Sequence, residues 1–485
     1  MDRRTFLRGA ALTVGSAVLA GCSPAARPSA VSPGPPSPAS PRPSGSTPLA
    51  SAARSRSVIV VGAGPAGLAA ARQLTVDGFA VTVLEARDRI GGRAWTSDAL
   101  GVPVDLGASW IHGIDGNPMT DLARAAGVEL VLTRDSAYAT FDVDGRRLNA
   151  NEDDLLYSHY QAILDKAVGS SSDPSRESVA AAFARTLAAG GQDTVPPRGL
   201  DPSLVERYLT WILATEVGLD WAADLAELSV GAQNDGDDYT GAWAQLVGGY
   251  RAILAPVAST LDVRLGERVE AVEVGDGVTV RTDISSHTAD RAILTLPLGV
   301  LKSGDVRFSP ALPTATQVAI DRLGMGDFFK VAMRFPAMDL AASVDWFGRL
   351  GETAFLEWVN LTPVTGVPTL VGFAGGSVAR RMETLSQDEV VSEALASARA
   401  AIGHDLPAPT ATVVTGWASD PFARGSYSFL AVGSGAADRE ALSEPIGDRL
   451  FIAGEAVDRR YPATVHGAWA SGIAAARQLA VLAGR

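Results

Sequence analysis

The sequence predicts an α/β fold in which a Rossmann-like dinucleotide-binding domain is interleaved with a mixed α+β domain. Three observations support this prediction. An apolar run at residues 58–61 leads directly into a glycine-rich turn, a second apolar run at 81–85 ends in an acidic residue, and strand, glycine and helix patterns recur at 449–483. Continuous apolar runs bounded by glycine are typical of buried parallel strands. We therefore expect a parallel sheet covered by helices.

The first strand, turn and helix carry the strongest local motif. Residues 58–61 read Val-Ile-Val-Val, residues 62–67 read Gly-Ala-Gly-Pro-Ala-Gly, and a helix is expected at 66–75. Glycines at this spacing permit a tight turn, close approach of the backbone to a pyrophosphate, and close packing of the helix on the strand. The positive end of the helix would then point at the phosphates.

The residues after the helix indicate which dinucleotide binds. Glu85 closes the second apolar run, 18 residues after Gly67. A carboxylate at this place accepts hydrogen bonds from ribose hydroxyls and repels a 2′-phosphate, which disfavours NADP. Residues 89–93 read Arg-Ile-Gly-Gly-Arg, and this second glycine pair favours FAD over a nicotinamide dinucleotide.

Four further segments carry distinctive motifs. Residues 105–113 read Asp-Leu-Gly-Ala-Ser-Trp-Ile-His-Gly, and residues 296–302 read Leu-Pro-Leu-Gly-Val-Leu-Lys. Residues 417–428 read Trp-Ala-Ser-Asp-Pro-Phe-Ala-Arg-Gly-Ser-Tyr-Ser, and residues 450–468 begin with Leu-Phe-Ile-Ala-Gly-Glu and end with Tyr-Pro-Ala-Thr-Val-His-Gly-Ala. With these segments the chain resembles the flavin amine oxidase family, which contains monoamine oxidases, polyamine oxidases and flavin-dependent histone lysine demethylases.

The resemblance spans about residues 58–482 in family order and is weakest at about 135–225. It implies the flavin amine oxidase architecture and an FAD that is bound without a covalent link, because Ser426 stands where some monoamine oxidases carry the cysteine that is joined to the flavin. The residues that the motifs and the resemblance together assign to FAD binding are Gly62, Gly64, Pro65, Ala66, Gly67, Glu85, Ala86, Arg87, Gly91, Gly92, Arg93, Gly107, Ala108, Ser109, Trp110, Val269, Trp417, Gly454, Glu455, Thr464 and Val465.

Four of these positions have a more specific expected role. The resemblance places Arg87 near the adenine ribose and Arg93 near the pyrophosphate. It also directs Glu455 toward the ribityl and phosphate region. Val269 is expected to meet the adenine through its backbone.

Lys330 is the first candidate catalytic residue. The chain has only three lysines, Lys166, Lys302 and Lys330, among 41 basic residues, and the last of them lies in the apolar context Phe-Phe-Lys-Val-Ala. A buried ammonium needs a partner. In the family that the chain resembles, a lysine in this segment binds a water next to flavin N5. The alternative is a lysine that faces solvent from a strand.

Tyr427 and Thr464 are expected, by resemblance, to flank the path of the substrate to the flavin. Monoamine oxidases have an aromatic residue on both sides of this path. A threonine on one side, as in several polyamine oxidases and histone demethylases, leaves room for a bulkier or longer amine. The alternative interpretation of Tyr427 is a core aromatic side chain.

His112 follows Trp110-Ile111, which lies beside flavin and substrate in polyamine oxidases. A neutral imidazole there is suited to accept a hydrogen bond or a proton from the substrate, and a structural role is equally open. His466 is expected to hold the loop over the flavin. Asp235, Asp237 and Asp238 are candidates for an anionic lip that attracts polyamines, with a solvated loop as the alternative.

The N-terminus predicts where the protein works. Residues 3–8 (Arg-Arg-Thr-Phe-Leu-Arg), the uncharged stretch 9–20 and Leu-Ala-Gly-Cys at 19–22 resemble a twin-arginine export signal that ends in a lipoprotein cleavage box. The apolar stretch is too short to span a bilayer stably. Cys22, the only cysteine, is the expected lipidation site, with an incidental thiol as the alternative. We expect interaction with the twin-arginine export machinery, and then lipid anchoring to the outer face of the bacterial cytoplasmic membrane or cell envelope.

The chain divides by composition. A segment rich in Pro, Ser and Ala follows the signal and has no apolar periodicity, so it is expected to be an extended tether. The expected organisation is a signal peptide at 1–22, the tether at 23–56, an FAD-binding domain at 57–130, 246–304 and 415–485, and a substrate domain at 131–245 and 305–414. Individual strands are expected at 269–274, 278–282, 291–296, 330–335 and 369–374, and helices at 387–402 and 471–482.

Charge and cysteine content exclude several classes of function. The net charge is −13, and the seven Arg and one Asp of residues 1–57 leave −19 on the remainder. An acidic body repels nucleic acid and anionic lipid and attracts cations weakly, although acidity also serves solubility alone. Without cysteine in the body, disulfides and a zinc site built on thiolates are excluded, and we expect no bound metal.

Together these observations predict an enzyme that oxidises a small primary or secondary amine, most similar to polyamine oxidases. Hydride would pass from the carbon beside nitrogen to flavin N5, with oxygen as the acceptor, giving an imine, then an aldehyde, and hydrogen peroxide. One alternative is an L-amino-acid oxidase of the same fold, which needs an arginine for the substrate carboxylate. Another is a lipoprotein that binds FAD or polyamine without turnover. A desaturase or porphyrinogen-type oxidase is disfavoured by residues 109–113.

Overall fold

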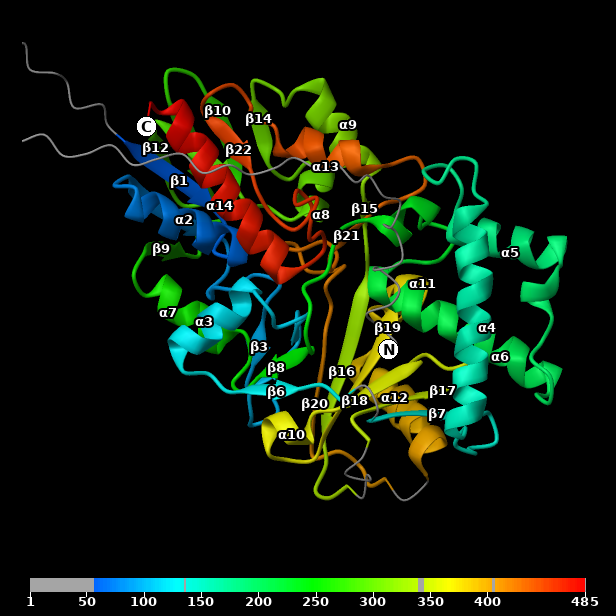
Figure 1. Cartoon of the computed structure of the whole chain (residues 1–485). Helices are drawn as coiled ribbons and strands as arrows, with labels where there is room; N and C mark the ends of the chain where they lie inside the picture. The colour runs from blue at the N-terminus through cyan, green and yellow to red at the C-terminus, as the bar shows by residue number, and fades with distance from the viewer. Residues whose placement is uncertain (1–55, 135–136, 339–343, 404–405, 485) are drawn as a thin grey trace, which may run out of the picture.

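The computed structural model describes residues 56–134, 137–338, 344–403 and 406–484 (Figure 1). The predicted signal, the tether up to Arg56 and Cys22 lie outside these residues. Among the described helices, none combines the length and the apolar character needed to cross a membrane.

A five-stranded sheet forms the centre of the part of the molecule that was predicted to bind FAD, which we call the cofactor half; the rest is the substrate half. Its strands are all parallel in the order β22-β13-β1-β2-β9, and Val60 in its middle pairs with Val83 on one side and Ile293 on the other. The strands come from the three separate chain segments that the sequence assigned to one domain. Their bounds are β1 Ser57–Val61, β2 Ala80–Glu85, β9 Asp262–Leu265, β13 Arg291–Leu294 and β22 Leu450–Ile452.

Helices α2 (Pro65–Val76) and α14 (Val465–Leu482) lie side by side against this sheet, one near each end of the chain (Figure 1). They pack closely because Gly472 of α14 faces the backbone of α2. A Cβ atom at Gly472 would lie 2.1 Å from the carbonyl oxygen of Ala66. Helices α3 (Pro118–Ala126) and α7 (Arg251–Ala258) extend this helical layer.

A second, four-stranded sheet in the order β12-β11-β10-β14 packs on the opposite face of the parallel sheet, so that Ile59 and Leu84 meet Val272 and Val280. This half is therefore a three-layer α/β/β arrangement. Strand β14 lies just beyond the predicted domain boundary at 304, yet it pairs in parallel with β10, so the boundary falls several residues later than expected. The bounds are β10 Val269–Val274, β11 Val278–Thr282, β12 Ser286–Ala289 and β14 Arg307–Ser309.

The substrate half is built on a six-stranded sheet in the order β20-β16-β19-β18-β17-β7. Alternate residues of β16 face opposite ways: Phe329, Val331 and Met333 pack under helix α12, whereas Ala332 packs with the residues facing the cofactor half. Lys330, two residues before Ala332, shares its face. The bounds are β7 Tyr138–Phe141, β16 Phe328–Arg334, β17 Trp346–Arg349, β18 Glu357–Asn360, β19 Thr369–Gly375 and β20 Ala411–Val414.

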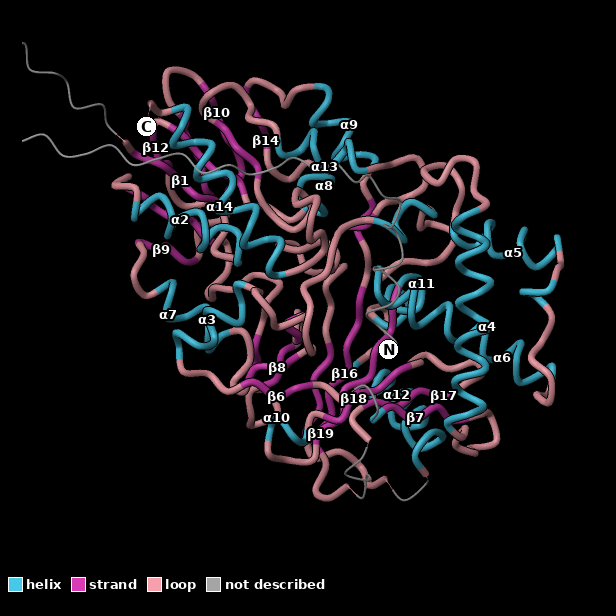
Figure 2. Tube along the Cα trace, in the orientation of Figure 1, coloured by secondary structure: helices cyan, strands magenta, loops and turns pink. Residues whose placement is uncertain are grey.

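Helices cover the outer side of this half. In Figure 2 the strands of the substrate half run between these helices and the helices of the cofactor half. Helix α12 (Gln387–Ile402) begins at a capping box formed by Ser386 and Glu389, in which each side chain bonds the backbone of the other. Its bounds are those expected from the sequence. The other helices of this half are α4 Ala150–Gly169, α5 Val179–Ala189, α6 Pro202–Ile212, the π-helix η3 Leu213–Leu219 and α11 Gly376–Met382.

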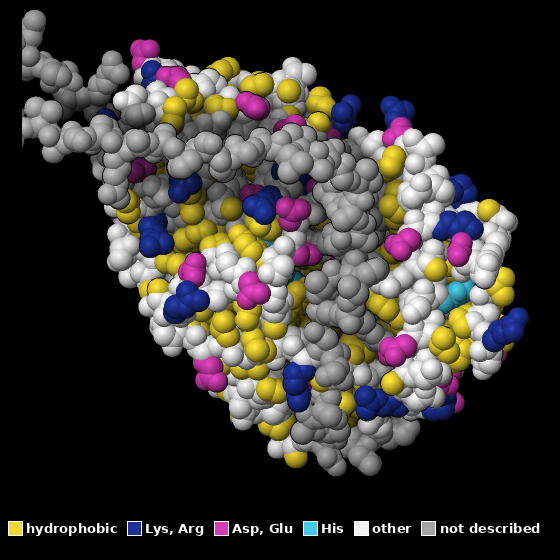
Figure 3. Space-filling view, in the orientation of Figure 1, with side chains coloured by type: hydrophobic (Ala, Val, Ile, Leu, Met, Phe, Trp, Pro, Cys, Tyr) yellow, Lys and Arg dark blue, Asp and Glu magenta, His cyan; other side chains and the backbone are white. Residues whose placement is uncertain are grey.

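Short elements connect the two halves. On the face shown in Figure 3, basic and acidic side chains are interspersed over both halves. The remaining elements are β3 Thr96–Ser97, β4 Val104–Asp105, β5 Trp110–Ile111, β6 Leu130–Leu132, η2 Gln192–Thr194, η4 Val230–Asn234, β8 Ala244–Leu246, α8 Leu298–Ser303, α9 Thr314–Arg322, β15 Gly324–Met325, α10 Thr362–Thr365, β21 Ser428–Phe429 and α13 Ala436–Ser443.

Candidate active site

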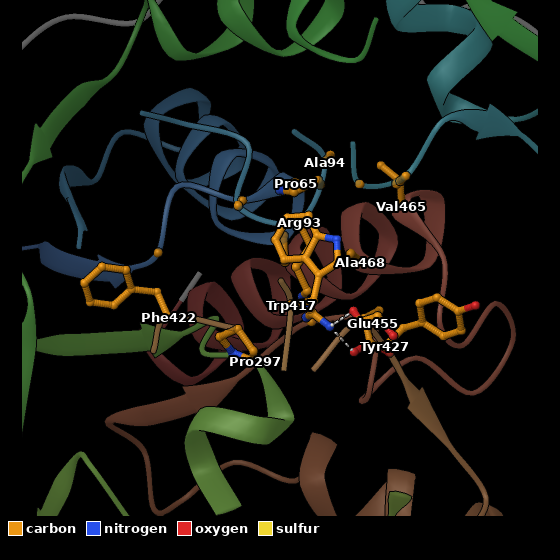
Figure 4. A pocket seen from close by; sticks show the side chains of 18 of the residues that line it. Pro65, Arg93, Ala94, Pro297, Trp417, Phe422, Tyr427, Glu455, Val465 and Ala468 are labelled. Carbon is orange, nitrogen blue, oxygen red and sulfur yellow. Dashed lines mark hydrogen bonds and ion pairs between the residues drawn. The ribbon is translucent and has the colours of Figure 1, made fainter. Parts of the chain in front are cut away.

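A cavity of about 650 Å³ lies where the two halves meet, lined by residues of both. One end lies at the carboxyl ends of β1, β2 and β13, where open α/β sheets bind their ligands. The other end reaches the face of the six-stranded sheet that carries Lys330. Figure 4 shows part of the wall, with Arg93 directed at Glu455 and Tyr427 beyond it.

The glycine-rich turn between β1 and α2 has the shape that the sequence predicts. A Cβ atom at Gly67 would lie 1.8 Å from the carbonyl oxygen of Gly62, so only glycine lets the helix start this close to the strand. The backbone N–H of Ala63 donates to Oε2 of Glu85 at 2.8 Å, and that of Arg87 donates to Oε1 at 2.9 Å. Burial raises the pKa of Glu85, and these two bonds oppose the increase.

Arg93 and Glu455 form an ion pair at 2.7 Å in the wall of the cavity. The same Arg93 nitrogen donates to the carbonyl of Ser426 at 2.9 Å. Burial alone would make the Glu455 carboxylate harder to ionise. The positive charge of Arg93 and the hydrogen bond from Ser428 outweigh burial and hold the pKa of Glu455 below its ordinary value.

Most residues predicted to bind the cofactor line this one cavity. Gly67 and Gly91 are not among the lining residues and act on the turn instead, Gly91 by donating its N–H to the carbonyl of Ala63 at 2.9 Å. The predicted residues that line the cavity are Gly62, Gly64, Pro65, Ala66, Glu85, Ala86, Arg87, Gly92, Arg93, Gly107, Ala108, Ser109, Trp110, Val269, Trp417, Gly454, Glu455, Thr464 and Val465.

Lys330 is buried in the cavity wall, with 5% of its surface exposed, so the solvent-facing alternative is wrong. Its Nζ donates to the carbonyl of Gly107 at 2.5 Å and to Oγ of Ser109 at 2.6 Å. The same atom lies 5.8 Å from the ring centre of Trp110 and 5.7 Å from that of Phe373, within the range of cation–π attraction.

Asp105 is a buried acidic residue close to Lys330. Its carboxylate is buried and accepts from Oγ1 of Thr96 at 2.6 Å and from the N–H of Tyr250 at 3.1 Å. Burial raises the pKa of Asp105 to about 6, against the hydrogen bonds and the charge of Lys330. Burial likewise lowers the pKa of Lys330 to about 8, and the Asp105 carboxylate opposes that decrease. The sequence motif contains Asp105, but only the fold shows that it lies near Lys330, whose Nζ is 3.5 Å from the backbone carbonyl of Asp105.

Aromatic side chains surround the Lys330 end of the cavity. The ring centres of Trp110 and Trp346 lie 5.0 Å apart, those of Phe328 and Phe373 5.4 Å, and those of Phe328 and Tyr427 6.2 Å. We call this end the aromatic chamber. Its lining is mostly aromatic with a few polar groups, which is typical of a site for a small organic molecule.

Glu357 brings a carboxylate into the lining of the aromatic chamber. It is 6% exposed, and Oε1 accepts from the hydroxyl of Tyr138 at 3.0 Å. Phe373 pairs with Lys330 on one side and with Glu357 on the other, so the three residues form a row across three strands. Sequence reasoning missed Glu357, although an acidic residue within a buried strand is itself a signal of a paired or functional group.

The family model for flavin containing amine oxidoreductases matches residues 65–480. The chain belongs to this family. It is 35% identical to polyamine oxidase 4 of Oryza sativa subsp. japonica, over 87% of this chain and 88% of that protein. It is also 36% identical to Protein FLOWERING LOCUS D and 37% identical to lysine-specific histone demethylase 1 homolog 1, both of Arabidopsis thaliana, and it spans about half the length of these two (55% and 52%).

Solved flavin amine oxidoreductase structures share the fold. Cyclohexylamine oxidase from Brevibacterium oxydans IH-35A superposes with a TM-score of 0.73 at 24% identity, over 89% of this chain and 100% of that one. A putrescine oxidase bound to putrescine gives 0.69 at 22% identity, over 89% and 99%. The predicted family, fold class and FAD cofactor are thereby confirmed, as is the assignment to the flavin amine oxidases.

The cavity wall fits FAD. The close turn at Gly67 leaves backbone N–H groups at the start of α2 for the pyrophosphate, and Glu85 keeps acceptor capacity for ribose hydroxyls. When bound, FAD supplies the acceptor for a hydride. The hydroxyl of Ser426 donates to the carbonyl of Gly326 at 2.8 Å. A thioether link to the flavin at this position would need the thiol of a cysteine instead.

Tyr427 and Thr464, the two residues expected to flank the substrate path, both line the cavity. Tyr427 lines the cavity and is half-buried, and its hydroxyl donates to the carbonyl of Leu219 at 2.9 Å, so it is not a core side chain. Thr464 also lines the cavity and is the N-cap of α14: its Oγ1 accepts from the N–H of Gly467 at 2.9 Å. It therefore has a structural role in addition to its place in the cavity lining.

The two histidines differ in position. His112 lines the cavity, with its ring 4.2 Å from that of Trp243 and edge-on to it, so both interpretations of His112 stay open. His466 is buried outside the lining, with Nδ1 3.5 Å from the amide nitrogen of Asn117 and its ring edge-on to Tyr461. This position agrees with a role in holding the loop.

The three acidic residues at 235–238 separate in the structure. Asp235 is buried and pairs with Arg439 at 2.8 Å, and Asp237 pairs with Arg460 at 3.0 Å. Of the three, only Asp238 lines the cavity. The predicted three-residue anionic lip is therefore wrong, because arginines that are distant in the sequence engage two of its members.

Proposed function

We propose that this flavin amine oxidase oxidises a primary or secondary amine that carries a second cationic group, as polyamines do. Hydride leaves the carbon beside the reacting nitrogen for FAD and one proton is lost, giving an imine. Water converts the imine to an aldehyde and releases ammonia from a primary amine, or a shorter amine from a secondary one. Oxygen then accepts both electrons and two protons and becomes hydrogen peroxide. The observation that carries the proposal is the buried carboxylate of Glu357 in the aromatic chamber.

The chamber treats the two ends of such a substrate differently. An amine must be neutral to lose hydride, and an apolar surrounding lowers the pKa of the amine at the flavin end. The distal amine, in contrast, gains from staying protonated beside the Glu357 carboxylate and the faces of Trp346 and Phe373. A second ammonium thus adds affinity that a monoamine lacks.

The same geometry disfavours an L-amino-acid oxidase, which needs an arginine for the substrate carboxylate. None of the arginines that line the cavity lies on β16, β17, β18 or β19, the strands that contribute Phe328, Trp346, Glu357 and Phe373 to the chamber. Four of the five pair with acidic residues. The lining arginines are Arg87, which pairs with Asp420, Arg93, which pairs with Glu455, Arg268, which pairs with Glu270, Arg424, which pairs with Asp305, and Arg307.

An anaerobic screen tests the proposal. Putrescine, spermidine, butylamine and L-amino acids are added in parallel to the holoprotein, loss of the flavin absorbance is followed, and peroxide is assayed after air is admitted. We expect di- and polyamines to bleach the flavin fastest. Faster bleaching by amino acids would favour the amino-acid oxidase, and no bleaching by any amine would favour a binding protein without turnover.

Glu357→Gln sharpens the test. The neutral amide keeps the size of the side chain but loses the charge, so we expect KM for putrescine to rise about tenfold or more while KM for butylamine changes little. Glu352→Gln is the matched control, because Glu352 is exposed and close in sequence. An equal change in KM for both amines would contradict a charge contact with the distal group.

We also propose export and lipid anchoring through Cys22, supported by the order of the twin-arginine pair, apolar stretch and cleavage box at residues 3–22. Cell fractionation and mass spectrometry of the mature N-terminus test this. The expected product is membrane-associated and begins at an acylated Cys22. A mature chain that retains residues 1–21 would overturn the proposal.

A further inference from the structure

Arg439 is a completely buried charge outside the cavity lining. It lies on α13, and its side chain has no exposed surface. Its Nε and Nη2 donate to Oδ2 of Asp235 at 3.0 and 2.8 Å, and its Nη1 donates to Oγ of Ser428 at 2.8 Å and to the carbonyl of Ala456 at 3.0 Å. A buried guanidinium is tolerated only when its charge and donors are satisfied, and here four bonds satisfy them.

The hydroxyl of Ser428 joins this pair to a second one at the cofactor. It accepts from Arg439 and donates to Oε2 of Glu455 at 2.6 Å, which uses both hydrogen-bonding functions of a hydroxyl. Oε1 of Glu455 is paired with Arg93. Two positive and two negative groups therefore alternate in a continuous network from Asp235 to Arg93.

The network holds the segment that carries Tyr427. The residue before it, Ser426, accepts from Arg93 through its carbonyl, and the residue after it, Ser428, bonds Glu455 through both N–H and hydroxyl. Secondary structure holds this segment weakly, because β21 has two residues and pairs only with the two-residue strand β15. Figure 4 shows Tyr427 next to the Arg93–Glu455 pair.

The other end of the network lies near a second lining residue, Asp238. Asp235 directly follows η4 and precedes by three residues Asp238, which lines the cavity. Arg439 thus ties the loop that carries Asp238 to the segment that carries Tyr427. Arg439 is therefore connected to two segments that line the cavity, although it does not line the cavity itself.

We propose that Arg439 is a positioning residue for amine oxidation, which through Ser428 and Asp235 fixes Tyr427 and the Asp238 loop around the substrate. This proposal rests on the proposed function, because it concerns the same chamber. Arg439→Lys tests it: lysine keeps the charge but cannot form the four bonds of the planar guanidinium. Ser428→Ala is the second variant, which removes only the bridging hydroxyl and leaves the Arg439–Asp235 pair in place.

We expect both variants to fold and to retain FAD, because the Arg93–Glu455 pair is unchanged. The limiting rate of flavin reduction by putrescine should fall about tenfold or more per bound flavin. Calorimetry with butyltrimethylammonium, which cannot form an imine, should give a Kd about tenfold higher than for the wild type. Arg381→Met is the control, because Arg381 is half-exposed and pairs with Glu393 at the surface.

A coupling measurement separates positioning from general stability. In a Tyr427→Ala background, Ser428→Ala should have little further effect on the Kd of butyltrimethylammonium, because the side chain it positions is already gone. Equal effects of Ser428→Ala in both backgrounds would overturn the proposal, as would wild-type reduction rates and Kd in both single variants. Failure of the proposed function looks different, since the wild type itself would then not be reduced by any amine.

Discussion

The two ends of the cavity are built by different means. At the cofactor end, one short stretch of chain, residues 57–93, supplies a strand, a turn, a helix and the acidic residue Glu85, and the shape of the turn depends on close backbone contacts. At the substrate end, Lys330, Phe373 and Glu357 come from three strands and meet only through their register. The cofactor end therefore tolerates little change of backbone, whereas the substrate end is tunable by single side chains.

The largest expected effect is at the cofactor end. In Gly67→Ala the new Cβ would meet the carbonyl of Gly62, so the turn must move and we expect protein with little or no bound FAD. The ratio of flavin absorbance to protein measures this. Gly169→Ala is the matched control, because nothing lies within 4 Å of a Cβ there. Normal FAD content in Gly67→Ala would show that the turn is less restrictive than its geometry indicates.

Lys330→Met should slow the reaction at the substrate end without changing FAD binding at the cofactor end. We expect full FAD content but flavin reduction or reoxidation at least about tenfold slower, which corresponds to about 1.4 kcal/mol in the barrier. Stopped-flow measurement of both half-reactions checks this. Lys302→Met is the control, because Lys302 bonds the carbonyl of Asp321 outside the lining. Wild-type rates in both half-reactions would remove Lys330 from the mechanism.

A pH profile tests the pairing of Lys330 with Asp105. A positive charge beside reduced FAD favours electron transfer to oxygen, so the reoxidation rate should fall as pH rises through about 8, the pKa to which burial lowers Lys330. Asp105→Asn removes the carboxylate that opposes this decrease, so the falling limb should move to lower pH by about one unit. An unchanged limb would mean that Asp105 does not act on Lys330.

The pH dependence of folding stability tests independently whether the pKa of Asp105 is raised in the folded protein. Burial raises the pKa of Asp105 to about 6 in the folded state, whereas an unfolded Asp titrates near 4. Between these values the folded state binds more protons, so the contribution of Asp105 to stability declines as pH rises from about 4 to 6. Melting temperatures of Asp105→Asn should lack this decline relative to the wild type. A parallel pH dependence of the two proteins would contradict the assignment.

The smallest expected effect is at Thr464. Thr464→Ala loses the N-cap of α14 and should cost about 1 kcal/mol of stability with amine turnover nearly unchanged. Thermal melting and steady-state assays measure the two quantities. Thr464→Ser keeps the capping oxygen and serves as the control. A loss of turnover in both variants at wild-type stability would place the role of Thr464 in substrate contact instead.

The sequence predicted the cofactor end well because its constraints are local. The glycine spacing and Glu85 lie within one βαβ unit, and the strands at 269–274 and 278–282 have the predicted bounds. In the substrate half the helix at 387–402 also has its predicted bounds, because its signals are local too. Alternation and capping residues encode such elements over a few positions.

The substrate end was predicted only in part, because contacts there join distant segments. Lys330 stood out by its apolar neighbours, but Glu357 became visible only when pairing of β18 with β19 placed it in line with Lys330. Asp235 was predicted as part of an exposed lip, because nothing near it in the sequence shows that Arg439, 204 residues later, neutralises it. Long-range pairing of this kind is not encoded in any local pattern.

The contact between α2 and α14 has a consequence for when the flavin site can form during protein synthesis. The helix that follows the first glycine motif packs against residues 465–482, and Gly454, Glu455 and Val465 complete the wall around the coenzyme. During synthesis on the ribosome, the nascent chain therefore presents the phosphate-binding turn first and has no closed pocket until residues 454–482 have emerged. The closed flavin site therefore needs both helices, and a chain that has not yet made α14 leaves exposed the side of α2 that α14 covers.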